Sequence, residues 1–177
     1  HFRKDGVEQH IKADHILVAT GRKPGTLGLG LEEVGVELNP DGTVKVDPFL
    51  RSSIPNIYAC GDVAGPFQFT HVAGHQAWYA TVNALFSPFK KFAVDYRVVP
   101  WCTFTDPELS RVGLSEEDTL AQNIAYEKTT FDLSMLDRAI AERNNYGMIK
   151  GLTKPGKDQI IGDANCGPHA GDLLSEF

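Results

Sequence analysis

The chain has 177 residues, of which 42% are hydrophobic and 23% charged, and a formal net charge of −6 at pH 7. This length allows one domain or two small ones with a buried core, and the composition is that of an ordinary globular protein. The negative charge argues against nucleic acid and anionic membranes as partners, and no apolar run approaches the roughly 20 residues of a membrane span. The chain lacks an initial Met and a signal peptide, and we expect that residue 1 is not a natural start.

Three cysteines, Cys60, Cys102 and Cys166, are spread along the chain. None has the CxxC or CxxxxC spacing of a redox dithiol or a zinc site, so neither site is predicted. Scattered thiols are typical of a reducing compartment, where they pack as small apolar side chains. The sequence therefore predicts a cytoplasmic protein without a metal site.

The first 50 residues are predicted to form two hairpins and a buried strand. Asp5-Gly6 is a strong two-residue hairpin signal. Ala13–Ala19 is apolar at its centre and is followed by Thr20-Gly21, which predicts a buried strand that ends in a turn. A second hairpin is expected around Asp41-Gly42, which has valines on both sides.

The centre of the chain is predicted to be a short strand followed by a glycine and an aspartate. Ile57–Ala59 has the β-branched and aromatic character of a buried strand. Gly61 ends this strand and permits a close approach of the backbone to a ligand. Asp62 then lies at the carboxyl end of a strand, where open α/β sheets bind their ligands.

A long helix is expected next, with Thr70 as its N-cap and its end near Phe86. One face of this helix is lined by alanines: Ala73, Ala77, Ala80 and Ala84. Its first turn has no acidic residue, so the positive end of the helix dipole is available to an anionic or electron-rich ligand group.

The pattern changes after residues 86–92, which we take as a domain boundary. The following part alternates strands and helices of the α+β type. Strands are predicted at 98–104, 126–131, 147–153 and 159–165. Helices are predicted after Ser115, at Asp137–Glu142 and from Gly167 onward.

Several motifs resemble those of the FAD-dependent pyridine nucleotide–disulfide oxidoreductases, which include dihydrolipoamide dehydrogenase, glutathione reductase and mercuric reductase. Ile57–Val63 resembles their second flavin-binding motif, and Ala19–Pro24 is similar to the ATG motif that closes their nicotinamide-binding domain. Tyr96–Leu114 is similar to the opening of their interface domain. Gln68–Ala73 and Leu136–Ile140 are similar to the mercuric-reductase-like branch.

This resemblance implies an α/β plus α+β fold. The C-terminal part of a nucleotide- and FAD-binding Rossmann-like region would be followed by an α+β interface (dimerisation) domain with an antiparallel sheet. Residues 1–50 would be the end of the NAD(P)-binding domain with its crossover hairpins, and residues 51–92 the C-terminal segment of the FAD-binding domain. Residues 93–177 would form the interface domain, cut short at its C-terminus, and would hold a homodimer together.

The resemblance also implies seven cofactor-binding positions: Gly21, Gly61, Asp62, Val63, Phe69, Thr70 and His71. The Asp62 carboxylate would accept hydrogen bonds from the ribityl hydroxyls of FAD. Backbone N–H groups of Phe69–His71 would lie near the flavin pyrimidine, and Gly21 would lie near the nicotinamide nucleotide. The residues alone leave a simpler alternative at Asp62 and Gly21, which is a turn. One departure is Gly25, where the family usually has Asn.

No residue is assigned a catalytic role. His71 and His169 each stand at a predicted helix start, where a packing or hydrogen-bonding role is more common than that of a base. Arg22 and Arg138 are expected to form surface or inter-domain salt bridges rather than to bind a phosphate.

By resemblance, the activity is electron transfer from NAD(P)H through FAD to a redox disulfide and then to a small molecule or metal ion. The family's GxGxxG and redox cysteine pair would precede residue 1, and its C-terminal His-Glu pair would follow residue 177. We therefore expect the chain alone to be inactive and to retain no FAD. The alternative is a non-catalytic dimerisation or binding module on the same fold. The final electron acceptor and the choice between NADH and NADPH stay open at this stage.

Overall fold

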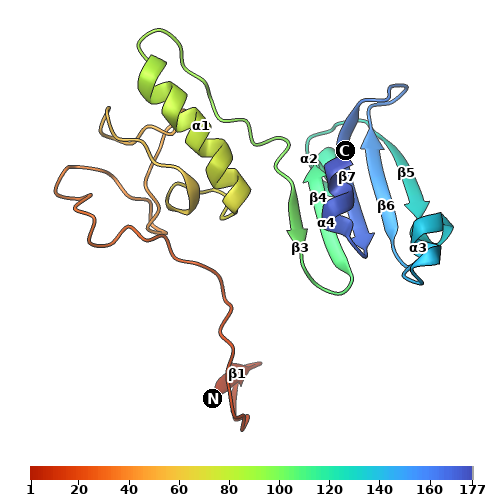
Figure 1. Cartoon of the computed structure of the whole chain (residues 1–177). Coiled ribbons are helices and arrows are strands. Elements are labelled where there is room, and N and C mark those ends of the chain that lie inside the picture. Colours follow the sequence, from red (N-terminus) through yellow and green to blue (C-terminus); the bar gives the residue numbers. More distant parts are fainter. Residues whose placement is uncertain (177) are drawn as a thin grey trace. The chain divides into compact units, whose positions relative to one another are not determined.

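The computed structural model describes residues 1–176 and divides them into two compact units, His1–Ala93 and a second unit that begins at Val94. Figure 1 colours both units along the sequence, and each unit has its own core. Within residues 1–176, no helix is both long and apolar enough to cross a bilayer.

The N-terminal hairpin predicted around Asp5-Gly6 is confirmed. β1 (Phe2–Lys4) pairs antiparallel with β2 (Val7–Gln9). Asp5 and Gly6 connect the strands with φ values of 51° and 79°, which is the left-handed conformation that tight hairpin turns require.

The prediction of a buried strand at Ala13–Ala19 is wrong. These residues form neither a helix nor a strand, and Ile16, Leu17 and Val18 are 84%, 91% and 73% exposed. A strand is stable only when its backbone groups pair with a neighbour, and none of the described residues pairs with this segment. An apolar pattern alone is therefore not sufficient to make this segment a strand.

Loops with little regular structure lie between residues 31 and 65. The hairpin predicted around Asp41-Gly42 is reduced to one β-bridge, between Leu38 and Val44. The strand predicted at Ile57–Ala59 is likewise reduced to one bridge with Arg51, and its residues are half-buried. The apolar core of this unit consists of Val36, Val44, Leu50, Ala64 and Val72.

The long helix α1 (Thr70–Phe86) ends where the sequence predicts, but its N-cap is Phe69 rather than Thr70. Phe69 has an extended backbone with φ −120° and ψ 140°, and Thr70 is already helical. The apolar Phe69 side chain cannot bond to the first backbone amides as a Thr side chain would. The start of α1 therefore has no side-chain cap of its own.

The fully buried residues of α1 are mainly polar, and of its alanines Ala73, Ala77 and Ala80 are half-buried. Its buried residues are Val72, Gln76 and Asn83, whereas Ala84 is exposed. The Asn83 side chain donates to the backbone oxygens of Phe49 at 3.0 Å and of Phe92 at 2.8 Å. The helix packs against loops whose buried backbone groups need hydrogen-bond partners, which amide side chains supply and alanines cannot.

The second unit is built on a five-stranded antiparallel sheet with the strand order β3-β4-β7-β6-β5 (Figure 1). In that order the strands are β3 (Trp101–Thr103), β4 (Glu108–Gly113), β7 (Ile160–Gly167), β6 (Met148–Thr153) and β5 (Glu127–Asp132). The helices of this unit are α2 (Glu116–Ala121), α3 (Asp137–Ala141) and α4 (Ala170–Leu173). The apolar core consists of Leu133, Ala139, Leu152, Ala170 and Leu174.

Strands β5, β6 and β7 and helix α3 lie where the sequence predicts them. The strand predicted at 98–104 is shorter, because Val98 and Phe104 are exposed and only Trp101–Thr103 pairs with β4. The helix predicted from Gly167 begins at Ala170. β4 was not predicted, since its sequence Glu-Leu-Ser-Arg-Val-Gly lacks a clear alternation of polar and apolar residues.

Helix α2 has the N-cap that the sequence predicts. The Ser115 hydroxyl accepts a hydrogen bond from the Asp118 amide at 3.0 Å, and the Asp118 carboxylate accepts one from the Ser115 amide at 2.9 Å. This reciprocal pair is a capping box. The hydrogen bonds from Ser115, with a smaller contribution from Arg111, hold the pKa of the Asp118 carboxyl below its usual range.

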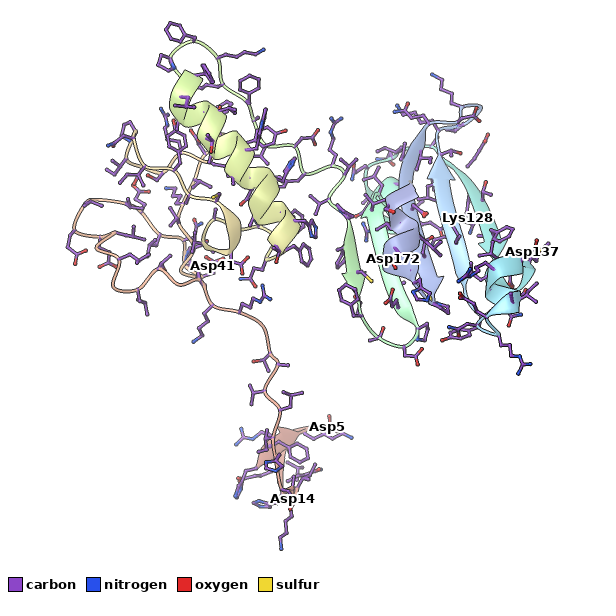
Figure 2. The ribbon with its side chains drawn as sticks, viewed as in Figure 1. Asp5, Asp14, Asp41, Lys128, Asp137 and Asp172 are labelled. Atoms are coloured by element: carbon purple, nitrogen blue, oxygen red, sulfur yellow. The ribbon has the colours of Figure 1, made fainter. Side chains whose placement is uncertain are left out.

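A second carboxylate of α2, that of Glu116, joins the helix to two strands. It lies 2.9 Å from Lys150 Nζ on β6 and 3.3 Å from Lys128 Nζ on β5. Figure 2 labels Lys128. It also accepts a hydrogen bond from the Tyr126 hydroxyl at 3.1 Å. Hydrogen bonds from Lys150, Lys128 and Tyr126 lower the pKa of Glu116 to about 2.

One face of the sheet contains three buried polar side chains, Ser110, Asp163 and Asn165. Ser110 Oγ donates to the backbone oxygen of Ala170 at 2.6 Å and so holds α4 against the sheet. With its amide nitrogen turned toward Asp163, Asn165 donates to Oδ2 at 3.2 Å. Asp163 is 2% exposed, and burial raises the pKa of its carboxyl to about 6. The centre of this sheet therefore contains a carboxyl group that is costly to ionise.

Candidate functional site

A cavity of about 450 Å³ lies in the first unit, at the residues that lead into α1. It is lined by Gly21-Arg22, by Asp41 with Thr43, and by Asp62 with the run Gly65–Phe69. Asp41 lies among the loops next to the start of α1 (Figure 2). The cavity thus combines three segments that are far apart in the sequence.

Asp62 and Arg22 form an ion pair at this cavity. Arg22 Nη1 donates to Asp62 Oδ2 at 3.2 Å and to the backbone oxygen of Gln68 at 3.3 Å. The salt bridge expected for Arg22 is therefore present, within one unit. An ionised carboxylate has about four acceptor positions, and the side chain of Asp62 is 38% exposed. Asp62 therefore retains the capacity to accept hydrogen bonds from a ligand.

The turn that carries Asp62 is fixed from behind by α1. It begins with η1 (Gly61–Val63), in which Gly61 is buried and has a φ of 77°. The Gly61 amide donates to Gln76 Oε1 at 2.6 Å, and Gln76 Nε2 donates to the backbone oxygen of Gly65 at 2.7 Å. A Cβ on Gly61 would lie 3.2 Å from that of Ala73. Glycine is therefore required here by its backbone conformation and by the close approach to the helix.

The opposite wall of the cavity is held by short-range hydrogen bonds. Asp41 Oδ1 accepts from the Thr43 amide at 3.0 Å and from its hydroxyl at 2.6 Å. These two bonds hold the pKa of the Asp41 carboxyl below its usual range. Next to this wall, the Val44 amide donates to the backbone oxygen of Val63 at 2.7 Å. That bond connects the 41–44 loop to the turn that carries Asp62.

A row of aromatic rings runs from the cavity into the first turn of α1. The rings of Phe67 and Phe69 are 6.2 Å apart at 13°, and those of Phe69 and His71 are 5.4 Å apart at 9°. Both Phe67 and Phe69 line the cavity. Phe67 and Phe69 give the cavity an apolar portion of lining, suited to the apolar part of a ligand.

Three of the seven predicted cofactor positions line this cavity: Gly21, Asp62 and Phe69. The other four lie outside the lining: Gly61, Val63, Thr70 and His71. Gly61 and Val63 belong to the turn that carries Asp62, whereas Thr70 and His71 are exposed in the first turn of α1.

Sequence reasoning missed the residue that holds the turn, Gln76, and the wall formed by Asp41 and Thr43. Asp41 was interpreted only as a hairpin residue. A signal for Gln76 exists, because it lies four residues after Val72 and seven before Asn83, on one helical face. A polar residue on a buried helical face indicates a specific hydrogen-bond partner.

The thiols and metal ligands add no second site. Cys60, Cys102 and Cys166 are half-buried and form no disulfide among the described residues. Within residues 1–176, His, Cys, Asp and Glu side chains form no group of three or more that could hold a metal ion.

Two family models match the chain, one in each unit. Residues 2–77 match the model described as pyridine nucleotide-disulphide oxidoreductase, and residues 99–177 match the dimerisation domain of the same family. The chain belongs to the pyridine nucleotide–disulphide oxidoreductase family. The resemblance found in the sequence motifs is thereby confirmed.

Sequence similarity to curated members of the pyridine nucleotide–disulphide oxidoreductase family extends over nearly the whole chain. The dihydrolipoyl dehydrogenase of Chlamydia muridarum is 36% identical over 164 residues, which are 93% of this chain and 35% of the relative. The mercuric reductase of Streptomyces lividans is 35% identical over 168 residues, which are 95% of this chain and 35% of the relative. The chain therefore spans about a third of the length of these relatives.

Solved structures with a similar fold include one flavoprotein disulfide reductase. LpdA from Mycobacterium tuberculosis matches with a TM-score of 0.77 and 29% identity, over 86% of this chain and 33% of that protein. The HOCl-induced flavoprotein disulfide reductase RclA from Escherichia coli matches with a TM-score of 0.76 and 28% identity, over 89% of this chain and 36% of that protein. The predicted fold class, α/β followed by an α+β dimerisation domain with an antiparallel sheet, is confirmed.

Proposed function

We propose that this chain is part of a flavin-dependent oxidoreductase that passes electrons from NAD(P)H through FAD to a redox disulfide and then to a substrate. The supporting observation is the cavity that joins Gly21-Arg22 to Asp62 and Phe69, in a member of the pyridine nucleotide–disulphide oxidoreductase family. The names of the relatives favour one of two electron acceptors: a lipoyl disulfide, whose two-electron reduction gives the dihydrolipoyl dithiol, or mercuric ion.

The residues around the cavity fit part of an FAD molecule. Asp62 has spare acceptor positions for the hydroxyls of the ribityl chain. A Cβ placed on Gly21 or Gly65 would meet no described atom within 4 Å, so both glycines leave open space at the lining. The ring of Phe69 supplies an apolar wall. A cavity of this size and lining suits a sugar-alcohol chain more than a whole dinucleotide.

Each proposed residue has a binding or orienting role. Asp62 accepts hydrogen bonds from hydroxyls, and Arg22 orients its carboxylate. The positive end of the α1 dipole, near Thr70 and His71, favours electron density on the ligand group that faces it. Gly61 and Val63 hold the turn in place, and Gly21 belongs to the nicotinamide side. FAD, when bound, supplies hydride and electron transfer, and the protein supplies binding and orientation.

The domain assignment follows the same proposal. Residues 1–50 would close the NAD(P)-binding domain, 51–92 would complete the FAD-binding domain, and 93–177 would form the interface of a homodimer. The three unpaired thiols favour a cytoplasmic location.

Gel filtration with light scattering would test the dimer, with an expected mass near twice the 19.4 kDa of one chain. A monomer at high concentration contradicts the interface assignment.

The cofactor proposal is tested on the full-length protein that contains this chain. We expect wild-type protein to be yellow, with one FAD per chain, and to oxidise NADH or NADPH. Asp62→Ala removes one to two charge-assisted hydrogen bonds of about 1.5–3 kcal/mol each, so FAD affinity should fall at least tenfold. Asp158→Ala, in the loop between β6 and β7, is the matched control and should leave FAD affinity unchanged.

Two results would contradict this assignment. A colourless full-length protein that still dimerises would favour the non-catalytic module instead. The 177-residue chain alone should retain no FAD and show no NAD(P)H oxidation, so a yellow and active preparation of it would refute the division of the cofactor site. Absorbance at the flavin band and a stopped-flow NADPH assay provide both readouts.

A further inference from the structure

We propose that Gln76 is the positioning residue of the cofactor turn, Gly61–Gly65: its buried amide bonds to both ends of the turn and thereby sets where Asp62 lies. This inference rests on the proposed flavin-binding function. It assigns a role to a residue that lies outside the cavity lining and acts through Asp62.

The contacts of Gln76 are directed at the two ends of the turn. Its Oε1 accepts a hydrogen bond from the Gly61 amide at 2.6 Å, and its Nε2 donates to the Gly65 oxygen at 2.7 Å. The residue is 0% exposed. Asp62 is the residue that follows the first contact, so the position of its carboxylate depends on this pair of bonds.

A primary amide meets both requirements at every pH, because it has a donor and an acceptor and does not titrate. The Gly61 amide needs an acceptor, and the Gly65 carbonyl needs a donor. An ionised Glu at position 76 has no donor for the Gly65 carbonyl, and the repulsion between the two oxygens would push the side chain away from the turn and weaken its bond to the Gly61 amide as well. An apolar side chain would leave both groups unsatisfied, at a cost of about 1–3 kcal/mol each.

The geometry makes Gln76 a rigid anchor. It lies in the second turn of the 17-residue α1, so its backbone is held by helical hydrogen bonds. From the other side, Arg22 bonds to Asp62 and to the Gln68 oxygen. The carboxylate of Asp62 is therefore restrained by Gln76 through the backbone and by Arg22 through the side chain, which is the preorganisation that a binding site requires.

The chain offers a matched control in Asn83. It lies on the same helix, is also 0% exposed, and bonds to Phe49 and Phe92 instead of the cofactor turn. Gln76→Glu and Asn83→Asp thus introduce the same chemical change at two equally buried sites. Both variants are expected to lower the thermal stability of the chain.

The first measurement is amide hydrogen exchange of the 177-residue chain by NMR. At pH 8, Gln76→Glu should increase the exchange of the Gly61 amide at least tenfold relative to the exchange of the α1 amides. Asn83→Asp should leave this ratio unchanged. An unchanged ratio in Gln76→Glu would overturn the proposal, whether or not the protein binds flavin.

The second measurement is the FAD affinity of the full-length holoprotein between pH 5.5 and pH 8. A protonated Glu both accepts and donates, so Gln76→Glu should bind FAD at least tenfold more weakly at pH 8 and recover most of that loss at pH 5.5. Asn83→Asp should show no such recovery. If both variants weaken FAD binding equally at every pH, Gln76 contributes only general stability and the proposal is wrong. If wild-type protein holds no flavin, the proposed function fails, and the exchange ratio alone decides the role of Gln76.

Discussion

Replacing Asp163 by Asn should make the chain more stable at neutral pH and leave its stability nearly unchanged in mild acid. Asp163 is 2% exposed on β7, and burial raises the pKa of its carboxyl from 3.8 to about 6. At pH 7 the native state therefore has to ionise this group in an unfavourable environment, whereas the unfolded chain ionises it in water.

The sign and size follow from the two pKa values. Because the folded pKa lies above the unfolded one, the native state binds more protons than the unfolded state between pH 3.8 and about 6. The free energy of unfolding consequently falls as the pH rises through this window and levels off above it. A shift of about two pKa units corresponds to about 3 kcal/mol, at 1.36 kcal/mol per unit. Since the Asn165 amide already bonds to the carboxylate, we take about 1–3 kcal/mol as the expected gain for Asp163→Asn at pH 8.

Urea unfolding measured by tryptophan fluorescence tests this prediction. The chain has two tryptophans, Trp78 in the first unit and Trp101 in the second, so a Trp78→Phe background isolates the unit that contains Asp163. At each pH, the free energy of unfolding of the Trp78→Phe background is subtracted from that of the Asp163→Asn variant in the same background. This subtraction removes the contributions of other titrating groups. A difference that stays constant from pH 4 to pH 8, or a destabilised variant at pH 8, would refute the reasoning. Asp132→Asn is a control of opposite sign, because hydrogen bonds from Ser134 lower the pKa of Asp132.

Three further predictions concern single residues. Glu116→Gln should destabilise the second unit at pH 7, because the ionised carboxylate of Glu116 stabilises the folded state. The destabilisation should become smaller as the pH falls from 4.5 through about 2, where the carboxylate is protonated. Urea titrations at pH 7 and pH 3 compare the two conditions. Gly61→Ala should cost about 1–2 kcal/mol, since φ is 77° and the new methyl group would meet Ala73, and a thermal melt that matches wild type would contradict this. Ser115→Ala removes the N-cap of α2 and should cost about 1 kcal/mol in urea unfolding, with Ser115→Asp retaining most of the stability.

Local hydrogen bonding was the part of the fold that the sequence predicted well. The Asp5-Gly6 hairpin and the Ser115 N-cap involve residues within a few positions of each other, and their signals are specific to one structure. The end of α1 at Phe86 and the strands β5, β6 and β7 were also predictable, because turn residues mark their limits.

Non-local contacts were the part that the sequence could not supply. Ala13–Ala19 has the pattern of a strand, yet a strand forms only where a partner is available. The roles of Gln76 and Asp163 depend on groups brought together by folding, so their residue types alone did not identify them. In the candidate site, Asp62 was predicted from its motif, whereas its partner Arg22, forty positions earlier, was predicted only as a member of some salt bridge.

The strand order of the second unit has a consequence for how this protein behaves at high concentration. β5 is the last strand of the sheet on its side, and all six of its residues are exposed. The outward backbone groups of such an edge can recruit a strand from another molecule, and charged side chains discourage that docking. Glu127 and Lys128 supply these charges on β5. Solubility of this unit therefore depends on the charges of β5, and a neutral β5 would offer neighbouring molecules a template for edge-to-edge aggregation.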